Sequence, residues 1–411
     1  MLRDSDVLST LMQRKPAYSL AQDLYCDPGV FKADMNHIWY KEWVFAIASC
    51  EIPKTGNYVV HDIGAYSVVI VRGSDGEIRA FHNSCRHRGS VLCKAKKGTG
   101  PKLVCPYHQW TYELDGRLLW ARDMGPDFDA SQHGLSRVHC RNLSGMVYIC
   151  LAEEAPEIDA FAERTAAYLA PHDLENSKVA YESTIVEQGN WKLVWENNRE
   201  CYHCAGNHPS LCRTFPEDPR YIGSDGELND LQQQHTARCE AVGAPSAFLE
   251  SGPGDWRYVR TPLLDGAESY TLDGKVASTR PNSTLPFRDA GALLKYKYPG
   301  CWNHFLSDHV ILFRVTPISP METEVCTKWL VHKDAVEGQD YDLQRLTEVW
   351  VATNSEDREV VENNQRGILS PAYRPGPYSP LHEGGLIQFT DWYASTMIAA
   401  MTGRSAAIAA E

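Results

Sequence analysis

The sequence predicts an α+β fold made of a small all-β domain and a larger domain that combines helices with an antiparallel sheet. Between residues 45 and 155, short runs of alternating apolar and polar residues are separated by Gly and Asn-Asp-type turns. After residue 155, helical periods flank several runs that alternate like antiparallel strands. We expect domain boundaries at 1–44, 45–155 and 156–411, with the first segment packing on the larger domain.

The first 44 residues are expected to be largely helical. Phe31, Met35, Ile38 and Trp39 form an apolar stripe at spacings of three and four, which indicates a packing face. The strands predicted for the all-β domain are residues 58–60, 67–71, 103–104 and 146–151. An acidic, Pro-containing stretch at 153–157 marks its end.

The larger domain is expected to begin with a helix at 156–169 and a strand at 179–186, followed by a helix over about 190–211. Residues 213–290 are rich in Pro, Gly, Asp and Ser, so we expect loops and small helices there. The remaining predicted elements are strands at 302–306, 309–316 and 322–332, a long helix at 341–366 ended by Gly367, and a frayed tail at 405–411.

Composition favours a protein that binds a small molecule. The 411 residues carry a formal charge of -13, which disfavours nucleic acid or an anionic membrane as partner. The longest apolar runs are strand-sized and the N-terminus is too polar for a signal peptide, so we expect a cytoplasmic protein. Most of the 13 cysteines, Cys201 and Cys204 among them, are expected to be reduced thiols.

Two Cys and two His in the all-β domain form a metal-ligand pattern. Cys85 and His87 stand two apart, and Cys105 and His108 three apart. Each pair can sit at the tip of a hairpin loop, so that four side chains converge on one centre. Structural zinc is one interpretation. The other is a 2Fe-2S cluster of the Rieske type, in which Cys binds one iron and His the other.

A second group of potential ligands lies in the predicted helix at 190–211. Asn197, Glu200 and His203 recur at a spacing of three and share one helical face, and His208 follows five residues on. Both imidazoles can bind one ion only if the helix widens or ends between them, and Gly206 and Pro209 supply such a break. By themselves, the two histidines could equally be ordinary helix-end residues.

At this point the sequence resembles the Rieske non-haem iron oxygenases. Residues 85–89, CRHRG, and 105–110, CPYHQW, are similar to that family's two cluster loops. The resemblance implies a 2Fe-2S cluster on Cys85, His87, Cys105 and His108, and a catalytic domain with a curved antiparallel sheet packed with helices. One departure is Gln109, where the family commonly has Gly.

The resemblance also implies a mononuclear Fe(II) held by two His and one carboxylate, with positions left open for O2. His203 and His208 are the expected imidazoles. Asp357 is the expected carboxylate, because it lies in register with an apolar helical stripe and because residues 353–358, TNSEDR, are similar to the family's third-ligand segment. Glu356 is the rival.

Glu200 is expected to act between subunits. In the family, a carboxylate three residues before the first His ligand bridges the iron site of one subunit to a cluster histidine of its neighbour in a ring-shaped homotrimer. Glu200 holds that position, with His108 as the expected partner across the interface. Most relatives carry Asp there. Asn197 corresponds to a family residue near the iron that orients and does not ligate.

Within the family, the resemblance is closest to the enzymes that demethylate quaternary ammonium compounds, namely glycine betaine and proline betaine (stachydrine). The similar segments are 105–125, 192–209, 261–275, 327–341 and 363–378. The implied reaction is a monooxygenation in which one N-methyl group is hydroxylated and leaves as formaldehyde. Electrons come from NAD(P)H through a separate flavin and iron-sulfur reductase, since this chain has no Gly-rich dinucleotide fingerprint.

A quaternary nitrogen has no hydrogen to donate, so aromatic faces should recognise it. We expect Trp302 and Phe305 to be walls of such a cage. Two alternatives remain: an aromatic-ring-hydroxylating dioxygenase, and, from a different class, a zinc-stabilised binding protein without catalysis.

Overall fold

The computed structural model describes residues 1–216 and 227–403, which form two compact units. The β unit is Tyr40–Ala162, and the large unit is Met1–Trp39 together with the chain from Glu163 onward. The N-terminal helices thus belong to the same unit as the C-terminal half of the chain. The boundaries 1–44, 45–155 and 156–411 stay a prediction.

The β unit contains two antiparallel sheets. Strands of the larger sheet follow the order β1-β10-β9-β4-β3-β2-β5, and a smaller sheet has the order β6-β7-β8. The strand bounds are β1 Val44–Ala48, β2 Asn57–Ile63, β3 Tyr66–Arg72, β4 Ile78–His82, β5 Lys97–Thr99, β6 Leu103–Val104, β7 Thr111–Tyr112, β8 Leu118–Trp120, β9 Arg137–Leu143 and β10 Met146–Cys150. Both β1 and β10 are buried along their whole length, so this end of the sheet forms core.

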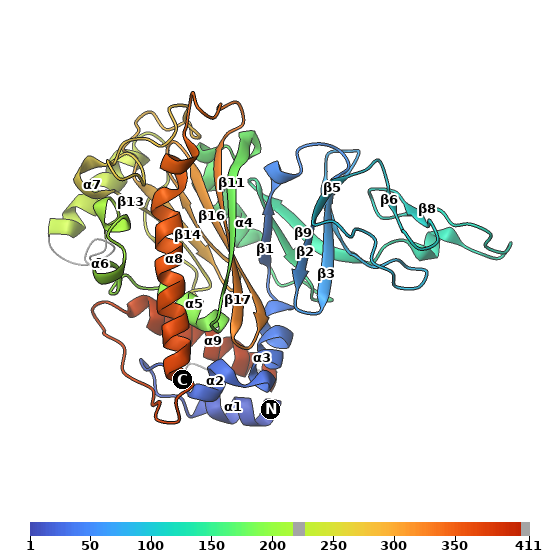
Figure 1. Ribbon diagram of the computed structural model, residues 1–411, viewed down its shortest axis with the longest axis horizontal. Helices are drawn as coiled ribbons and strands as arrows, with labels where there is room; N and C mark the ends of the chain where they lie inside the picture. The colour runs from blue at the N-terminus through green and yellow to red at the C-terminus, as the bar shows by residue number, and fades with distance from the viewer. Residues whose placement is uncertain (217–226, 404–411) are drawn as a thin grey trace. The chain divides into compact units, whose positions relative to one another are not determined.

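A seven-stranded antiparallel sheet is the centre of the large unit, with the order β11-β17-β16-β15-β14-β13-β12 (Figure 1). It is curved like half a barrel. The strand bounds are β11 Ser177–Glu187, β12 Leu249–Glu250, β13 Trp256–Thr261, β14 Ala292–Lys297, β15 Cys301–Phe305, β16 Val310–Ser319 and β17 Glu322–His332.

Helices cover both faces of this sheet. Their bounds are α1 Asp4–Met12, α2 Gln22–Cys26, α3 Pro28–Asp34, α4 Asp159–Leu169, α5 Trp191–Asn198, α6 Cys204–Asn207, α7 Glu227–Glu240, α8 Leu343–Ile368 and α9 Gly384–Thr402. From α5, Trp195 packs on Trp302 with ring centroids 5.2 Å apart. From α8, Trp350 packs on Phe313 at 5.0 Å. Because side chains alternate along each strand, α5 and α8 both pack against one face of β15 and β16.

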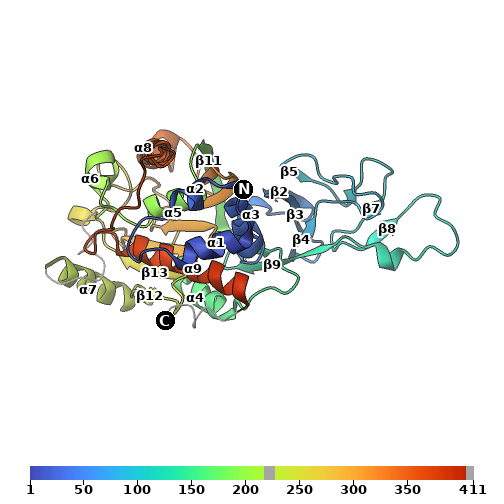
Figure 2. The same cartoon turned by 90° about the horizontal axis from the view of Figure 1, so that it is seen from below.

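A buried carboxylate ties α5 to the N-terminal and C-terminal helices, which lie side by side in Figure 2. Asp34, at the end of α3, accepts hydrogen bonds from Trp191 Nε1 at 2.9 Å and from the Tyr393 hydroxyl at 2.8 Å, and it pairs with the fully buried Lys192 ammonium. Because a buried charge without partners is costly, this network fixes the position of α5.

Several elements differ from the sequence prediction. The segment 213–290 was expected to hold loops and small helices, but it contains strand β13, and β14 follows it. Helix α9 was not predicted, and α8 continues through Gly367 to Ile368. Short strands and glycine-led helices depend on tertiary partners, which local periodicity does not show. The predicted tail at 405–411 lies outside the described residues.

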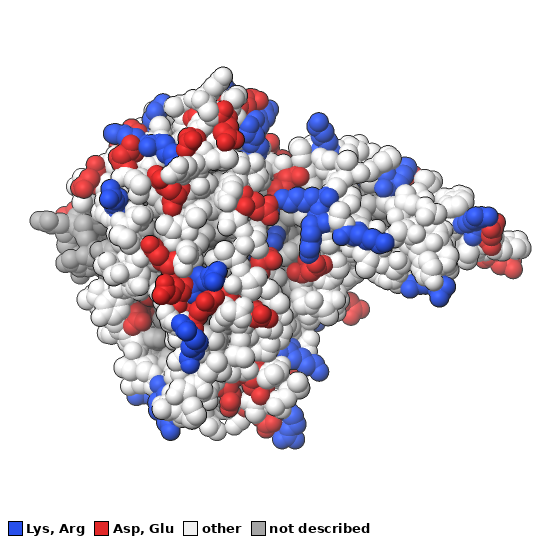
Figure 3. All heavy atoms as spheres, viewed as in Figure 1, with Lys and Arg blue, Asp and Glu red and all other residues white. Residues whose placement is uncertain are grey.

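The surface agrees with the acidic composition. On the face drawn in Figure 3, Lys and Arg side chains are interspersed with Asp and Glu and form no broad basic area. In the described parts of the chain, every helix is too short or too polar to cross a lipid bilayer.

Candidate active site

Two loops of the β unit carry the predicted cluster ligands and have the same backbone design. In each loop the cysteine N–H, of Cys85 or Cys105, donates at 2.8 Å to the carbonyl five residues later. The N–H of Gly89 or Gln109 then donates back to the cysteine carbonyl, at 2.9 and 3.0 Å. Gly89 has φ 75° and Gln109 has φ 62°, so both loops turn through the left-handed region. This explains why glycine is common where this chain has Gln109.

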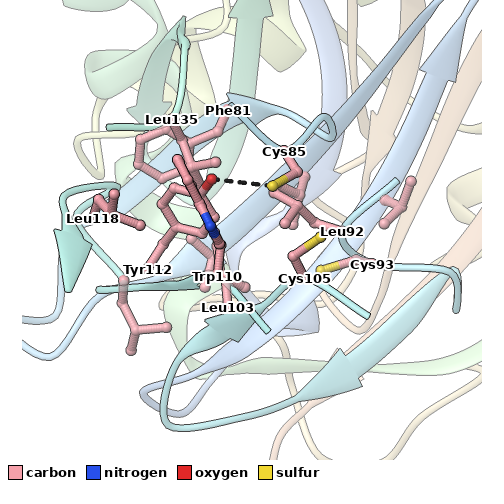
Figure 4. Packing of buried hydrophobic residues seen from close by; sticks show 14 residues of the cluster. Phe81, Cys85, Leu92, Cys93, Leu103, Cys105, Trp110, Tyr112, Leu118 and Leu135 are labelled. Atoms are coloured by element: carbon pink, nitrogen blue, oxygen red, sulfur yellow. Dashed lines mark hydrogen bonds between the residues drawn. The ribbon is translucent and has the colours of Figure 1, made fainter. Parts of the chain in front are cut away.

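Among the four predicted ligands, the two cysteines lie in a different environment from the two histidines. Cys85 and Cys105 are buried in an apolar cluster behind the two loops, and Figure 4 shows their sulfur atoms on the same side of it. His87 and His108 are partly exposed, with ring centroids 4.7 Å apart. Two thiolates at one end and two imidazoles at the other are the donors of a Rieske 2Fe-2S cluster.

Individual atoms in these loops also fit a bound cluster. His87 Nδ1 is buried and has no hydrogen-bond partner among the described residues, so a metal would satisfy it. Tyr112 accepts a hydrogen bond from Arg86 N at 3.1 Å, which leaves its hydroxyl proton for Cys85 Sγ at 3.2 Å. Burial raises the pKa of the Cys85 thiol, whereas this hydroxyl lowers it. Hydrogen bonds to cluster sulfurs tune the reduction potential.

The second group of ligands does not lie on one continuous helix, as the sequence had suggested. Helix α5 ends at Asn198, and His203 and His208 flank the short helix α6. Glu200 causes the break, because its carboxylate accepts hydrogen bonds from the backbone N–H groups of Tyr202 and His203 and so replaces helical partners. The chain therefore turns before His203 and not at Gly206.

This turn brings His203 and His208 together with Asp357 of α8. The two Nε2 atoms lie 3.0 Å apart, and Asp357 Oδ1 lies 3.3 Å from His203 Nε2 and 2.9 Å from His208 Nε2. Two imidazoles and one carboxylate on one side of a point form the facial triad of non-haem Fe(II) enzymes.

The electrostatics of this triad favour a cation. Asp357 Oδ1 is buried and accepts no hydrogen bond of good geometry from the described residues, despite the two nearby nitrogens. Burial opposes charge on His203, but Asp357 and Glu200 outweigh it and raise its pKa to about 9. The pKa of His208 is also raised, against burial, by Asp357. A metal ion replaces the protons that such a site otherwise holds.

Two further carboxylates fix the outward nitrogens of the imidazoles. Glu200 Oε1 lies 2.6 Å from His203 Nδ1, and Glu356 Oε2 lies 2.9 Å from His208 Nδ1. Acceptors at this nitrogen set the tautomer that presents Nε2 to the metal. The structure thus gives Glu356 an orienting position and leaves Asp357 as the carboxylate that meets both Nε2 atoms.

Asn197 and two cysteines complete the surroundings of His203. Asn197 Nδ2 is 3.3 Å from His203 Nε2, beside the point on which the triad converges. Cys201 and Cys204, which were expected to be free thiols, form a disulfide on either side of His203. Their side chains meet because the turn after α5 folds the chain back on itself. The sulfur of Cys204 lies near both imidazoles but is not free to bind a metal.

A cavity of about 420 Å³ opens from the triad into the large unit. Trp302, a predicted cage wall, lines it together with Trp350, which lies seven residues before Asp357 on the same face of α8. Phe305 is not among its lining residues. The Phe305 ring is completely buried against His172, on the opposite face of the sheet. Residues three apart in a strand point to opposite faces, so Trp302 and Phe305 could not line one cage.

Several cavity residues have no signal in the sequence. Tyr296, Arg257 and Phe215 reach the cavity from segments in which no motif stands out, and Arg199, next to Glu200, was not predicted as a site residue. Of these residues, only Arg199, which directly follows α5, could have been inferred from the helical face that leads to the site. Arg257 and Tyr296 depend on strand pairing, whereas Phe215 lies outside the strands.

Two family models match the chain. The Rieske [2Fe-2S] domain covers residues 42–139, which include all four predicted cluster ligands, and the ring hydroxylating alpha subunit (catalytic domain) covers residues 174–399, which include the triad. The first match decides between structural zinc and a 2Fe-2S cluster, in favour of the cluster.

The chain is also similar to characterised proteins over nearly its whole length. It is 50% identical over 394 residues to the glycine betaine monooxygenase oxygenase subunits of Pseudomonas aeruginosa (strain UCBPP-PA14) and Chromohalobacter salexigens, covering 94% of this chain and 91% and 88% of those proteins. The fold is that of the quaternary ammonium Rieske monooxygenase CntA in complex with L-carnitine, with a TM-score of 0.71 at 21% identity over 95% of this chain and 98% of that one. By domain content, ligand pattern and similarity, this chain belongs to the Rieske non-haem iron oxygenases.

Proposed function

We propose that the chain is the oxygenase component that N-demethylates glycine betaine. The observation that carries this proposal is the His203, His208 and Asp357 triad at one end of a cavity walled by Trp302 and Trp350. Indole faces bind a quaternary ammonium group that cannot form hydrogen bonds. The 50% identity to glycine betaine monooxygenase oxygenase subunits supports the same substrate.

The protein contributes binding and orientation to this reaction. Trp302 and Trp350 hold the ammonium group and exclude water, while Glu200 and Glu356 hold the imidazoles in one tautomer. When bound, the mononuclear iron supplies O2 activation and the 2Fe-2S cluster supplies stored electrons. Glycine betaine, O2, NAD(P)H and one proton give dimethylglycine, formaldehyde, water and NAD(P)+.

The reducing equivalents reach this component from a separate reductase, as the oxygenase-subunit relatives imply. For the assembly, we extend the proposal to a homotrimer in which Glu200 contacts His108 of the neighbouring subunit. Support comes from the structure of a quaternary ammonium Rieske monooxygenase that was described as giving insights into inter-subunit electron transfer. A cytoplasmic location remains a prediction.

The test is a product assay on the oxygenase reconstituted with an NAD(P)H-dependent reductase. Glycine betaine, proline betaine, carnitine and simple arenes would be offered separately. We expect formaldehyde from glycine betaine in a one-to-one ratio with O2 consumed. Conversion of an arene to a diol without formaldehyde from any betaine would favour the ring-hydroxylating alternative and reject this proposal.

A further inference from the structure

The cavity that begins at the metal triad is also lined by two arginines. Arg199 follows the last residue of α5, and Arg257 lies on β13. Both belong to the large unit, like the triad. Neither residue has a part in binding the metal or in holding the imidazoles.

Strand pairing places Arg257 at the end of an ordered row. Arg257 is directly opposite Tyr296 of β14, Tyr296 is opposite Trp302 of β15, and Trp302 is opposite Phe313 of β16. Paired residues share a face of the sheet, and adjacent strands are about 5 Å apart. The wall of the cavity therefore changes from cationic to aromatic along the row, in steps of about 5 Å.

The two guanidinium groups lie close to the same aromatic ring. The Arg199 guanidinium lies 4.2 Å and the Arg257 guanidinium 5.2 Å from the centre of the Tyr296 ring. Burial lowers the pKa of Arg257, and the nearby charge of Arg199 lowers it further. Two like charges have thus been brought together at the edge of a cavity, which is unfavourable unless an anion joins them.

Among the described residues, the charge of Glu250 acts on both arginines and raises the pKa of each. Neither guanidinium forms an ion pair with a described carboxylate, and Glu250, the nearby acid, accepts a hydrogen bond from Tyr296 at 2.8 Å. Arg199 is only 7% exposed. Its hydrogen bonds are long, 3.4 Å to Tyr296 and 3.5 Å to Gln388, and its Nε is buried with no partner in the described structure. A buried, unpartnered donor beside a cavity is available to a ligand.

We propose that Arg199 and Arg257 bind the carboxylate of the substrate and so make the enzyme specific for short betaines. This inference rests on the proposed function and adds to it the residues that select a carboxylate. In glycine betaine a single methylene separates the ammonium group from the carboxylate, and both guanidinium groups lie close to the Tyr296 ring, which is the neighbour of Trp302 in the row. The ammonium group then lies against Trp302, toward the triad, while the carboxylate meets the two guanidinium groups.

The experiment compares two ligands of nearly the same shape, glycine betaine and its amide, which lacks the negative charge. Dissociation constants would be measured by calorimetry on the oxidised enzyme, and KM and kcat by formaldehyde release. For Arg257→Gln we expect Kd and KM for glycine betaine to rise on the order of 100-fold. Binding of the amide should change by less than about threefold, and Arg257→Lys should lie between the two, since lysine lacks the bidentate fork.

Arg164→Gln is the matched control, because Arg164 is exposed on α4 and does not line the cavity. It should bind both ligands like the wild type. Arg199→Lys provides a second variant, and its content of mononuclear iron reports whether the large unit is intact. If that variant does not fold, the Arg257 variants decide. Equal losses for glycine betaine and its amide in Arg257→Gln, or wild-type affinity for glycine betaine, would overturn the proposal.

Failure of the proposed function would look different. Wild-type enzyme that releases no formaldehyde from any betaine would reject glycine betaine demethylation, whatever the arginine variants do. The carboxylate site would then be judged from calorimetry alone, with a charge-dependent loss in Arg257→Gln supporting it and an equal affinity rejecting it.

Discussion

In each imidazole of the iron site, the two nitrogens contact different partners. His203 and His208 turn Nε2 toward each other and toward Asp357, and they give Nδ1 to Glu200 and Glu356. Three carboxylates thus surround two histidines, but only one meets both Nε2 atoms. This difference separates a metal ligand from residues that orient ligands.

Asp357→Ala should therefore lose the mononuclear iron and turnover while the 2Fe-2S spectrum stays intact, because the cluster is held by the other unit. Glu356→Gln should retain iron at equilibrium but bind it roughly 10- to 100-fold more weakly, as expected for an outer carboxylate. Iron content and visible absorption measure both effects. Full iron and activity in Asp357→Ala, together with iron loss in Glu356→Gln, would show that the ligand is Glu356.

At the scale of elements, α5 is the support on which the iron site is built. Its buried face carries Lys192, paired with Asp34, and Glu196, which accepts hydrogen bonds from Tyr25 at 2.8 Å and Tyr378 at 3.3 Å. Burial raises the pKa of Glu196 to about 7, although the two tyrosine hydroxyls oppose this shift. The helix thus depends on a carboxyl group that is protonated below neutral pH.

The sign of the pH dependence follows from this pKa. Between pH 4.5, the ordinary value for Glu, and about pH 7, the folded protein holds a proton on Glu196 that the unfolded chain has lost. The free energy of unfolding should consequently fall across this window, by about 3 kcal/mol from this group. Glu196→Gln should remove most of that fall, as measured by urea unfolding at pH 5 and pH 8.

Glu359→Gln serves as the control, because Glu359 is exposed on α8. It should leave the pH dependence of unfolding as in the wild type. If Glu196→Gln has the same pH dependence as well, Glu196 is not the group responsible.

At the scale of the whole molecule, each unit completes one metal centre, and Glu200 is the residue through which the proposed assembly would connect them. One oxygen of Glu200 contacts His203 and the other holds the turn after α5, while 12% of the side chain remains exposed. A neighbouring subunit could therefore still reach it. The expected partner is the partly exposed His108.

Glu200→Gln should keep both metal centres, since Glu200 ligates neither, but slow the oxidation of a pre-reduced cluster at least 10-fold in a single turnover with substrate and O2. Metal content, cluster absorption and the mass of the assembly serve as controls. Wild-type rates in this variant, or full activity in a protein shown to be monomeric, would refute the inter-subunit relay.

Local chemistry made part of the site predictable. Spacing and donor type predicted a shared metal centre for the four residues Cys85, His87, Cys105 and His108 in two compact loops, and the resemblance to the family's cluster loops implied that this centre is a 2Fe-2S cluster. Asp357 could be proposed because a carboxylate on an apolar helical stripe needs a partner. The break after α5 was misplaced, because the sequence pointed to Gly206 as the breaker, whereas the Glu200 side chain ends the helix through backbone hydrogen bonds.

The sequence by itself determined the α+β class and, through its resemblance to known cluster loops, the oxygenase family, and it predicted the two metal-ligand sets, because short-range motifs contain that information. Only the tertiary structure decided which residues form the cavity. Trp302 faces it and Phe305 does not, and Arg257 lies in one row with Tyr296 and Trp302. The physical reason is that strand register joins residues far apart in the chain, and a shift of one residue would turn every side chain of a strand to the other face.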